Sequence, residues 1–170
     1  MSKFDEDSLV HNNILDLEIV IDRSVAQVWK QLMDVGSWVT SHDIEEVSDV
    51  RRTLGAITRV SARRAKELGF PPPHYHYCKI IHLIPERQCV LKSYSEKGGS
   101  YGMRMTGFDD TRLIAVDGQT KISFRAYSEY RGELLIKMSE ALKSAEEDDH
   151  MLKNVENLKR IVENQPRIKG

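Results

Sequence analysis

The chain lacks the features that would place it in or across a membrane. None of its apolar runs approaches the ~20 residues that a helix needs to cross a bilayer. The stretch from Met1 to Asn13 is polar and acidic, which is typical of neither a signal peptide nor a transit peptide. Two cysteines, Cys78 and Cys89, are too few for a disulfide framework, and we expect two buried thiols. These absences favour a cytoplasmic protein.

An excess of charge of either sign is also missing. The 25 basic and 26 acidic side chains give a formal net charge of −1. A near-neutral chain has no general electrostatic attraction to polyanions, so nucleic acid and anionic membranes are not expected partners. Hydrophobic residues make up 40% and charged residues 30% of the 170 positions, a balance typical of one globular domain with a sizeable core.

Motifs that hold metals or cofactors are equally scarce. The sequence has no Gly-rich phosphate loop, nucleophile elbow or Cys-x-x-Cys pair, and no cofactor is expected. His74 and His76 would share one face of a strand, with His82 on the same face but too far along to join them. With no further ligand motif, surface or cavity-lining histidines are favoured over a metal site.

The period of the hydrophobic pattern changes near residue 23. Apolar residues at every second position from Leu15 to Ile21 predict a strand over residues 14–22 with one buried face. Helical spacing follows, so we predict a helix over residues 25–35, ended by Gly36. Ser24 and Gln27 form the pattern of a capping box at its start.

Strand-like segments separated by turn signals occupy the middle of the chain. We predict strands at residues 45–52, 56–64, 75–84, 88–96, 101–116 and 119–130. Gly55 marks one turn and Asp117-Gly118 a tight hairpin, and a bulge is expected near Asp109-Asp110. Successive hairpins indicate an antiparallel sheet.

Helical periodicity returns after Gly132 and predicts one long final helix. Four adjacent carboxylates at residues 146–149 repel one another and favour fraying there. A curved antiparallel sheet with a long helix laid across it is an α+β fold. We expect a loose leader at residues 1–13, a single domain at 14–164 and a loose tail at 165–170.

Several of these positions resemble a known superfamily. The matching residues are Asp22, Ser24, Val28-Trp29, Asp34, Trp38, Gly55, Leu158-Lys159 and Glu163. Together they resemble the SRPBCC or START-like proteins, and most nearly the bacterial polyketide cyclase/dehydrase family. The resemblance implies the helix-grip fold, in which a seven-stranded sheet wraps around the last helix and two short helices follow the first strand. It also implies an apolar cavity used for lipids, polyketides or other apolar molecules.

A cavity of that kind would take its lining from the strands and the last helix. The expected lining residues are His76, Tyr77, Ile80, Tyr94, Met105, Ile122, Phe124, Met138 and Leu142, with His76 or Tyr94 as a polar contact. The tyrosines are equally well explained by ordinary strand composition.

Three functions remain open at this stage. The first is binding of a small hydrophobic molecule without demonstrable catalysis. The second is an aromatic polyketide cyclase or dehydratase, which needs an acid/base group inside the cavity. The third is a co-chaperone-like interaction module, which would show a filled cavity and an exposed apolar patch. Catalytic residues and oligomeric state do not follow from the sequence.

Overall fold

The computed structural model describes residues 10–50, 52–63, 67, 69, 75–95, 104–131 and 150–168. In chain order its elements are β1 (Val10–Ile21), α1 (Val25–Met33), α2 (Val35–Trp38), β2 (His42–Glu46), β3 (Ile57–Ala62), β4 (Tyr75–Ile84), β5 (Gln88–Tyr94), β6 (Arg104–Val116), β7 (Gln119–Arg131) and α5 (His150–Glu163). Within the described residues, no helix is both long enough and apolar enough to span a membrane.

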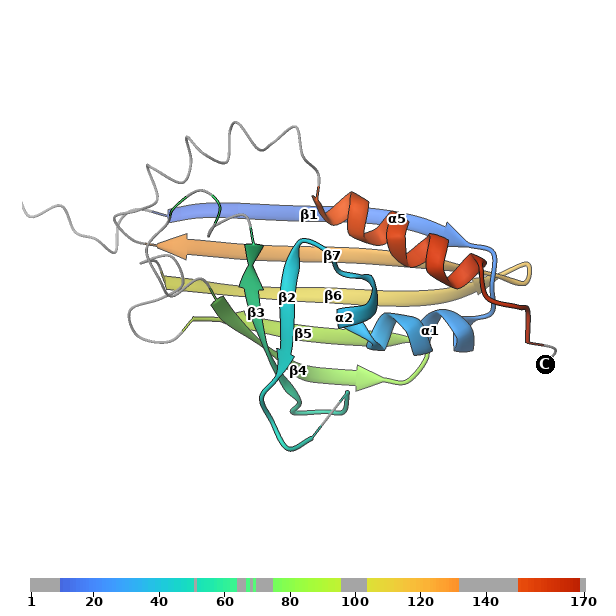
Figure 1. The fold of residues 1–170 in the computed structure, drawn as a ribbon, viewed down its shortest axis with the longest axis horizontal. Helices are drawn as coiled ribbons and strands as arrows, with labels where there is room; N and C mark the ends of the chain where they lie inside the picture. Colours follow the sequence, from blue (N-terminus) through green and yellow to red (C-terminus); the bar gives the residue numbers. More distant parts are fainter. Residues whose placement is uncertain are drawn as a thin grey trace, which may run out of the picture.

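The described strands form one antiparallel sheet of seven strands in the order β1-β7-β6-β5-β4-β3-β2. In Figure 1, β2 and β3 run across the direction of the longer strands, so the sheet folds over at this edge. The helices α1, α2 and α5 lie on the same side of the long strands. The predicted curved sheet with a C-terminal helix is therefore confirmed. The acidic cluster at 146–149 lies outside the described residues.

At the start of α1, one of the two hydrogen bonds of the predicted capping box is present. The Ser24 hydroxyl accepts a hydrogen bond from the Gln27 backbone nitrogen at 3.4 Å and caps the helix. The Gln27 side chain does not complete a capping box: its oxygen accepts from the Ile168 backbone nitrogen at 3.4 Å, and its amide nitrogen donates to the Pro166 carbonyl at 2.9 Å. Gly36 does not end α1, because the helix stops at Met33 and Gly36 lies within α2.

Strand register corrects two expectations. Pairing runs without a shift through Asp109 and Asp110, so the predicted bulge is absent there. The shift occurs in β4 instead, between Ile80 and His82. An extra residue in a strand reverses which side chains face inward. His82 consequently lies on the opposite face from His76 and is exposed.

The Asp117-Gly118 hairpin is confirmed. Both residues have positive φ, at 49° and 78°, which is the geometry of a two-residue type I′ turn. Gly55 likewise has φ 87° and permits the turn before β3. The first of these turns sets the long, unbroken pairing between β6 and β7.

The packed core occupies one end of the sheet, beneath α1 and α5. Trp38 is buried here; its indole nitrogen donates to the Leu32 carbonyl at 3.1 Å, and its ring lies 6.5 Å from that of Phe124. Its other fully or nearly fully buried members are Ile21, Val28, Leu32, Leu113, Ile122, Val155, Leu158 and Val162. Complete burial of such side chains contributes about 1.5–3 kcal/mol each. This end of the molecule is solid.

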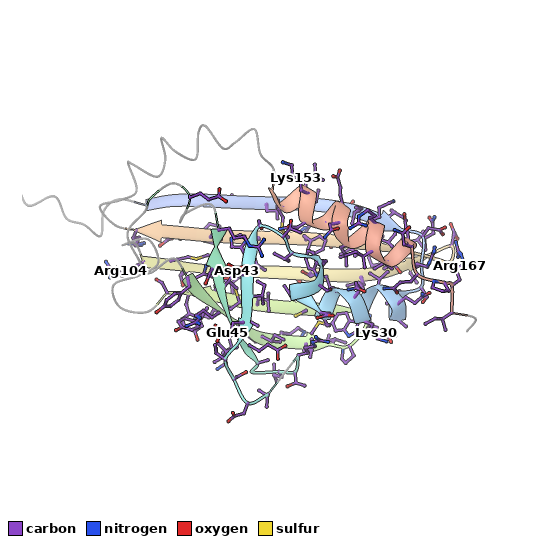
Figure 2. All side chains as sticks on the ribbon, viewed as in Figure 1. Lys30, Asp43, Glu45, Arg104, Lys153 and Arg167 are labelled. Carbon is purple, nitrogen blue, oxygen red and sulfur yellow. The ribbon has the colours of Figure 1, made fainter. Side chains whose placement is uncertain are left out.

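The chain after α5 is tied back to the start of α1. The Arg23 guanidinium donates to the Gln165 carbonyl at 2.8 and 3.0 Å and to the Glu163 carbonyl. Arg167, labelled beyond α5 in Figure 2, pairs with Asp22 at 2.5 Å. Residues 165–168, expected to be loose, therefore make specific contacts with the β1–α1 connection.

Candidate ligand-binding cavity

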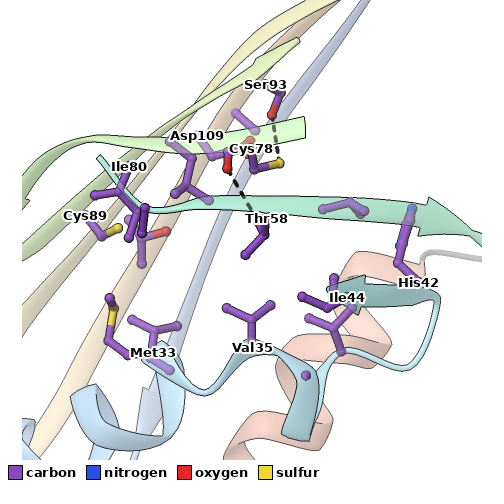
Figure 3. A pocket seen from close by; sticks show the side chains of 18 of the residues that line it. Met33, Val35, His42, Ile44, Thr58, Cys78, Ile80, Cys89, Ser93 and Asp109 are labelled. Atoms are coloured by element: carbon purple, nitrogen blue, oxygen red, sulfur yellow. Dashed lines mark hydrogen bonds between the residues drawn. The ribbon is translucent and has the colours of Figure 1, made fainter. Parts of the chain in front are cut away.

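A cavity of about 740 Å³ lies beyond the packed core, between the inner face of the sheet, α2 and β2. Figure 3 shows Met33, Val35 and Ile44 on one side of it, and Ile80 and Cys89 on the other. Most of the described lining is apolar and comprises Leu15, Leu32, Met33, Val35, Trp38, Val39, Ile44, Val50, Ala56, Ile57, Val60, Ile80, Leu91, Met105, Phe124, Ala126 and Met151.

The described part of the last helix meets this cavity at one end. Val155, Leu158 and Val162 of α5 pack directly into the core, with exposed fractions of 0%. Of the residues described from position 150 onward, Met151 and Asn154, in the first turns of α5, are the two that reach the cavity lining. The described part of the last helix thus closes one end of the hollow, while the folded-over strands and α2 enclose its sides.

Four of the expected lining residues do line the cavity: His76, Ile80, Met105 and Phe124. Ile122 belongs to the solid core instead, because its position on β7 lies beneath α5. Met138 and Leu142 lie outside the described residues. The contact of any of these side chains with a ligand stays a prediction.

Tyr77 and Tyr94 are not among the lining residues. They are paired across β4 and β5, and their rings stack at 5.6 Å on the face opposite Cys78 and Ser93. Side chains alternate along a strand, so Tyr77 cannot share a face with His76. Tyr94 therefore does not serve as a polar contact in this cavity.

A row of small residues crosses the cavity floor. Strand register places Thr58 opposite Cys78, Cys78 opposite Ser93, Ser93 opposite Gly107, and Gly107 opposite Ser128. All except Gly107 line the cavity. The Cys78 thiol and Ser93 hydroxyl are hydrogen-bonded at 3.4 Å, as the dashed line in Figure 3 shows. Short side chains leave the space that a ligand would fill, and their hydroxyl and thiol groups make this strip of the floor polar.

Asp109 lies next to this row, on β6 between Leu91 of β5 and Ala126 of β7. Its carboxyl group lines the cavity. Burial raises the pKa of Asp109 to about 6, and a hydrogen bond from the Ser93 side chain offsets part of that rise. A carboxyl group in this position can exchange a proton near neutral pH.

The two thiols are both buried and unbridged, as expected. Burial raises the pKa of Cys78 to about 12 and that of Cys89 to about 11. Both therefore stay protonated at neutral pH. A protonated, buried thiol acts as a small apolar lining group and not as a nucleophile.

His76 supplies a second polar group. Its Nδ1 is buried and has no hydrogen-bond partner within the described part of the chain. Burial lowers the pKa of His76 to about 4, so the ring is neutral at physiological pH. The His42 ring meets it edge-on at 6.5 Å. A neutral imidazole with an unsatisfied nitrogen is suited to a hydrogen bond with a ligand.

No group of three or more metal-binding side chains gathers among the residues that the structure describes. His74, the other member of the His-x-His pair, lies outside them. His82, the third histidine considered, faces away from His76.

Charged side chains surround the cavity mouth. Arg52 pairs with Asp34 at 2.8 Å and with Glu46 at 3.8 Å. Asp43 and Glu45, labelled on β2 in Figure 2, pair with arginines of the β3 region. Exposed pairs of this kind contribute about 0–1 kcal/mol each, so they shape the rim more than they stabilise the fold.

Comparison with known proteins identifies similar folds. Neither a scan of protein-family models nor a search of curated protein sequences finds a match. An uncharacterised protein from Rhizobium leguminosarum superposes with a TM-score of 0.64 at 11% identity, covering 92% of this chain and 98% of that one. Norcoclaurine synthase from Thalictrum flavum gives 0.57 at 14% identity, with 92% and 97% covered. A protein from Chromobacterium violaceum gives 0.60 at 13% identity, with 90% and 99% covered.

These identities are low, so the similarity concerns the fold. It extends over nearly the whole length of each chain. It agrees with the strand order and with the C-terminal helix on the inner side of the sheet. The chain therefore has the helix-grip fold.

Proposed function

We propose that this protein binds a small hydrophobic molecule, of lipid, polyketide or other aromatic or isoprenoid type, in the cavity described above. The observation that carries the proposal is the volume of about 740 Å³ combined with a mostly apolar lining. Ligand sites typically enclose about 300–1,000 Å³ and combine apolar walls with a few polar groups. His76 and Asp109 supply such groups.

The similar folds give this proposal limited support. One solved structure of norcoclaurine synthase holds dopamine and hydroxybenzaldehyde; it matches with a TM-score of 0.54 at 15% identity, covering 98% of this chain and 95% of that one. The same fold thus accommodates small aromatic molecules in that protein. The described residues enclose a cavity of this size among them, which weighs against the co-chaperone-like alternative, because that alternative predicts an interior filled by side chains.

Titration with N-phenyl-1-naphthylamine, a neutral dye that fluoresces in apolar sites, tests the proposal. Ala126→Phe places a large ring at the cavity lining and is expected to weaken dye binding strongly. Ala115→Phe is the matched control, because Ala115 is exposed on the same sheet and does not line the cavity. Circular dichroism verifies that both variants fold.

Saturable dye binding by the wild type and by Ala115→Phe, lost in folded Ala126→Phe, supports the proposal. Absence of binding to the wild type, or equal binding by both variants, contradicts it. Native mass spectrometry of protein purified from its own source then identifies the natural ligand as a co-purifying mass.

A second candidate is catalysis of the aromatic polyketide cyclase or dehydratase type in the same cavity. Asp109 favours it, since a buried carboxyl group with a pKa of about 6 suits proton transfer near neutral pH. Incubation with an open-chain β-hydroxyketone that mimics a polyketide intermediate, followed by mass spectrometry, tests this. Loss of one water from the mimic with wild type but not with Asp109→Asn supports catalysis, and an unchanged mass with both contradicts it.

A further inference from the structure

Among the residues that the structure describes, no cation is paired with Asp109. Within the described part of the chain it forms no ion pair with any lysine, arginine or histidine, and the interaction shown for its carboxyl group is with Ser93. The adjacent Asp110, in contrast, faces outward and pairs with Arg112 at 2.8 Å. Asp109 is partly buried, and a carboxylate that loses part of its hydration without gaining a cation lowers the stability of the folded protein.

The surroundings of Asp109 leave room for a partner. Across β5 and β7 its neighbours are Leu91 and Ala126, and the next row of the floor carries Ser93, Gly107 and Ser128. Ser93 and Ser128 line the cavity in this row, and their hydroxyls can accept hydrogen bonds. The rest of the described cavity wall is mostly apolar.

We propose that the cavity selects hydrophobic amines, with the ligand's ammonium group bound to the Asp109 carboxylate and its apolar body against the opposite wall. The inference rests on the proposed binding function and narrows it to a substrate class. An ammonium group donates hydrogen bonds, which the Asp109 and serine oxygens accept. A neutral ligand of the same shape would leave the buried carboxylate unpaired.

A matched pair of ligands tests this inference. At pH 8, 4-phenylbutylamine and 4-phenylbutan-1-ol compete with N-phenyl-1-naphthylamine for the wild-type protein. The two differ in the terminal group alone. A charge-assisted hydrogen bond to a partly buried carboxylate predicts that the amine competes at concentrations lower by about tenfold or more. Asp109→Asn keeps the shape of the side chain and is expected to bring the two ligands within about twofold of each other.

Asp110→Asn is the control. It removes the neighbouring carboxylate, which bonds to Gln88 and Arg112 and does not line the cavity, so the preference for the amine is expected to persist. Equal competition by both ligands on the wild type, or a preference that survives in Asp109→Asn, overturns the inference. Dye binding without amine preference leaves the proposed function standing, whereas absence of dye binding overturns both.

Discussion

The side-chain oxygen of Asn154 accepts hydrogen bonds from both the backbone nitrogen and the hydroxyl of Thr40, at 2.9 and 3.1 Å. The amide nitrogen of Asn154 donates to the Ser41 hydroxyl at 2.8 Å. Asn154 is 2% exposed and sits at the cavity end of α5. One buried amide therefore joins the last helix to the segment that leads into β2.

Asn154→Ala is expected to destabilise the protein by about 1–3 kcal/mol, because it removes the three hydrogen bonds that this buried amide makes with Thr40 and Ser41. Urea unfolding measures the loss. Glu156→Ala, on the exposed face of the same helix, controls for helix propensity and is expected to change stability by less than about 0.5 kcal/mol. Equal effects from the two variants would show that the bonds to Thr40 and Ser41 contribute little.

Gly107→Ala is expected to destabilise the fold by about 1–3 kcal/mol. A Cβ atom at this position would lie 2.7 Å from the Tyr127 carbonyl oxygen, which is backbone within the β6–β7 pairing and cannot move alone. Gly36→Ala provides the control, because nothing lies within 4 Å of its Cβ. Urea midpoints compare the two, and a Gly107 variant as stable as the Gly36 variant would contradict the close strand approach.

The stability of the wild type is expected to fall with rising pH on account of Asp109. Its pKa is raised from 3.8 to about 6 by burial, so the folded state holds a proton that the unfolded state has lost between these values. Above pH 6 the buried charge opposes folding. Asp109→Asn should therefore be more stable than the wild type at pH 8 by about 1–3 kcal/mol, with a smaller difference near pH 4.

Urea unfolding at pH 8 and pH 4.5 measures this difference. The Asp110→Asn control loses bonds to Gln88 and Arg112 and should gain no stability at pH 8. A wild type that matches or exceeds Asp109→Asn in stability at pH 8 would show that the Asp109 carboxylate is compensated in the folded chain.

His76 acts in the opposite direction. Its pKa is lowered from 6.5 to about 4 by burial, so the unfolded state binds a proton that the folded state does not between these values. Stability that depends on neutral His76 is complete above pH 6.5 and is lost as the pH falls toward 4, by up to about 3 kcal/mol. His76→Phe removes this contribution. Its stability should therefore fall less than that of the wild type as the pH drops from 6.5 to 4.

Thermal unfolding between pH 4 and pH 7 compares His76→Phe with the wild type. His82→Phe is the matched control, since His82 is exposed on the other face of the same strand. The stability of this variant should depend on pH as that of the wild type does. Equal losses of stability for the wild type and His76→Phe between pH 7 and pH 4 would mean that the imidazole is hydrated in the folded state.

Local patterns were sufficient for most elements of the fold. The strand at 75–84 and the start of α1 follow from periodicity, and the Ser24 cap and the Asp117-Gly118 turn follow from residue types with fixed backbone preferences. Gln27 marks the limit of such reasoning. Its side chain bonds to the distant Pro166 carbonyl and Ile168 backbone nitrogen, and no local pattern predicts those contacts.

The residues that line the cavity were harder to predict, because they depend on which residues are paired across neighbouring strands. The bulge after Ile80 reverses the inward face of β4, and nothing in the alternation of the sequence around it locates the shift. Asp109 was interpreted as part of a bulge, although unbroken pairing places it on the cavity wall. No sequence signal distinguished it from its outward-facing neighbour Asp110.

The sequence by itself determined the order of strands and helices, the antiparallel sheet and the buried, unbridged cysteines, because each follows from hydrophobic period, turn residues or composition. Tertiary structure decided where the hollow lies and what faces it. Strand register aligned Thr58, Cys78, Ser93, Gly107 and Ser128 from five different strands into one row. Such a row is created only by long-range backbone pairing, which fixes side-chain neighbours that are far apart along the chain.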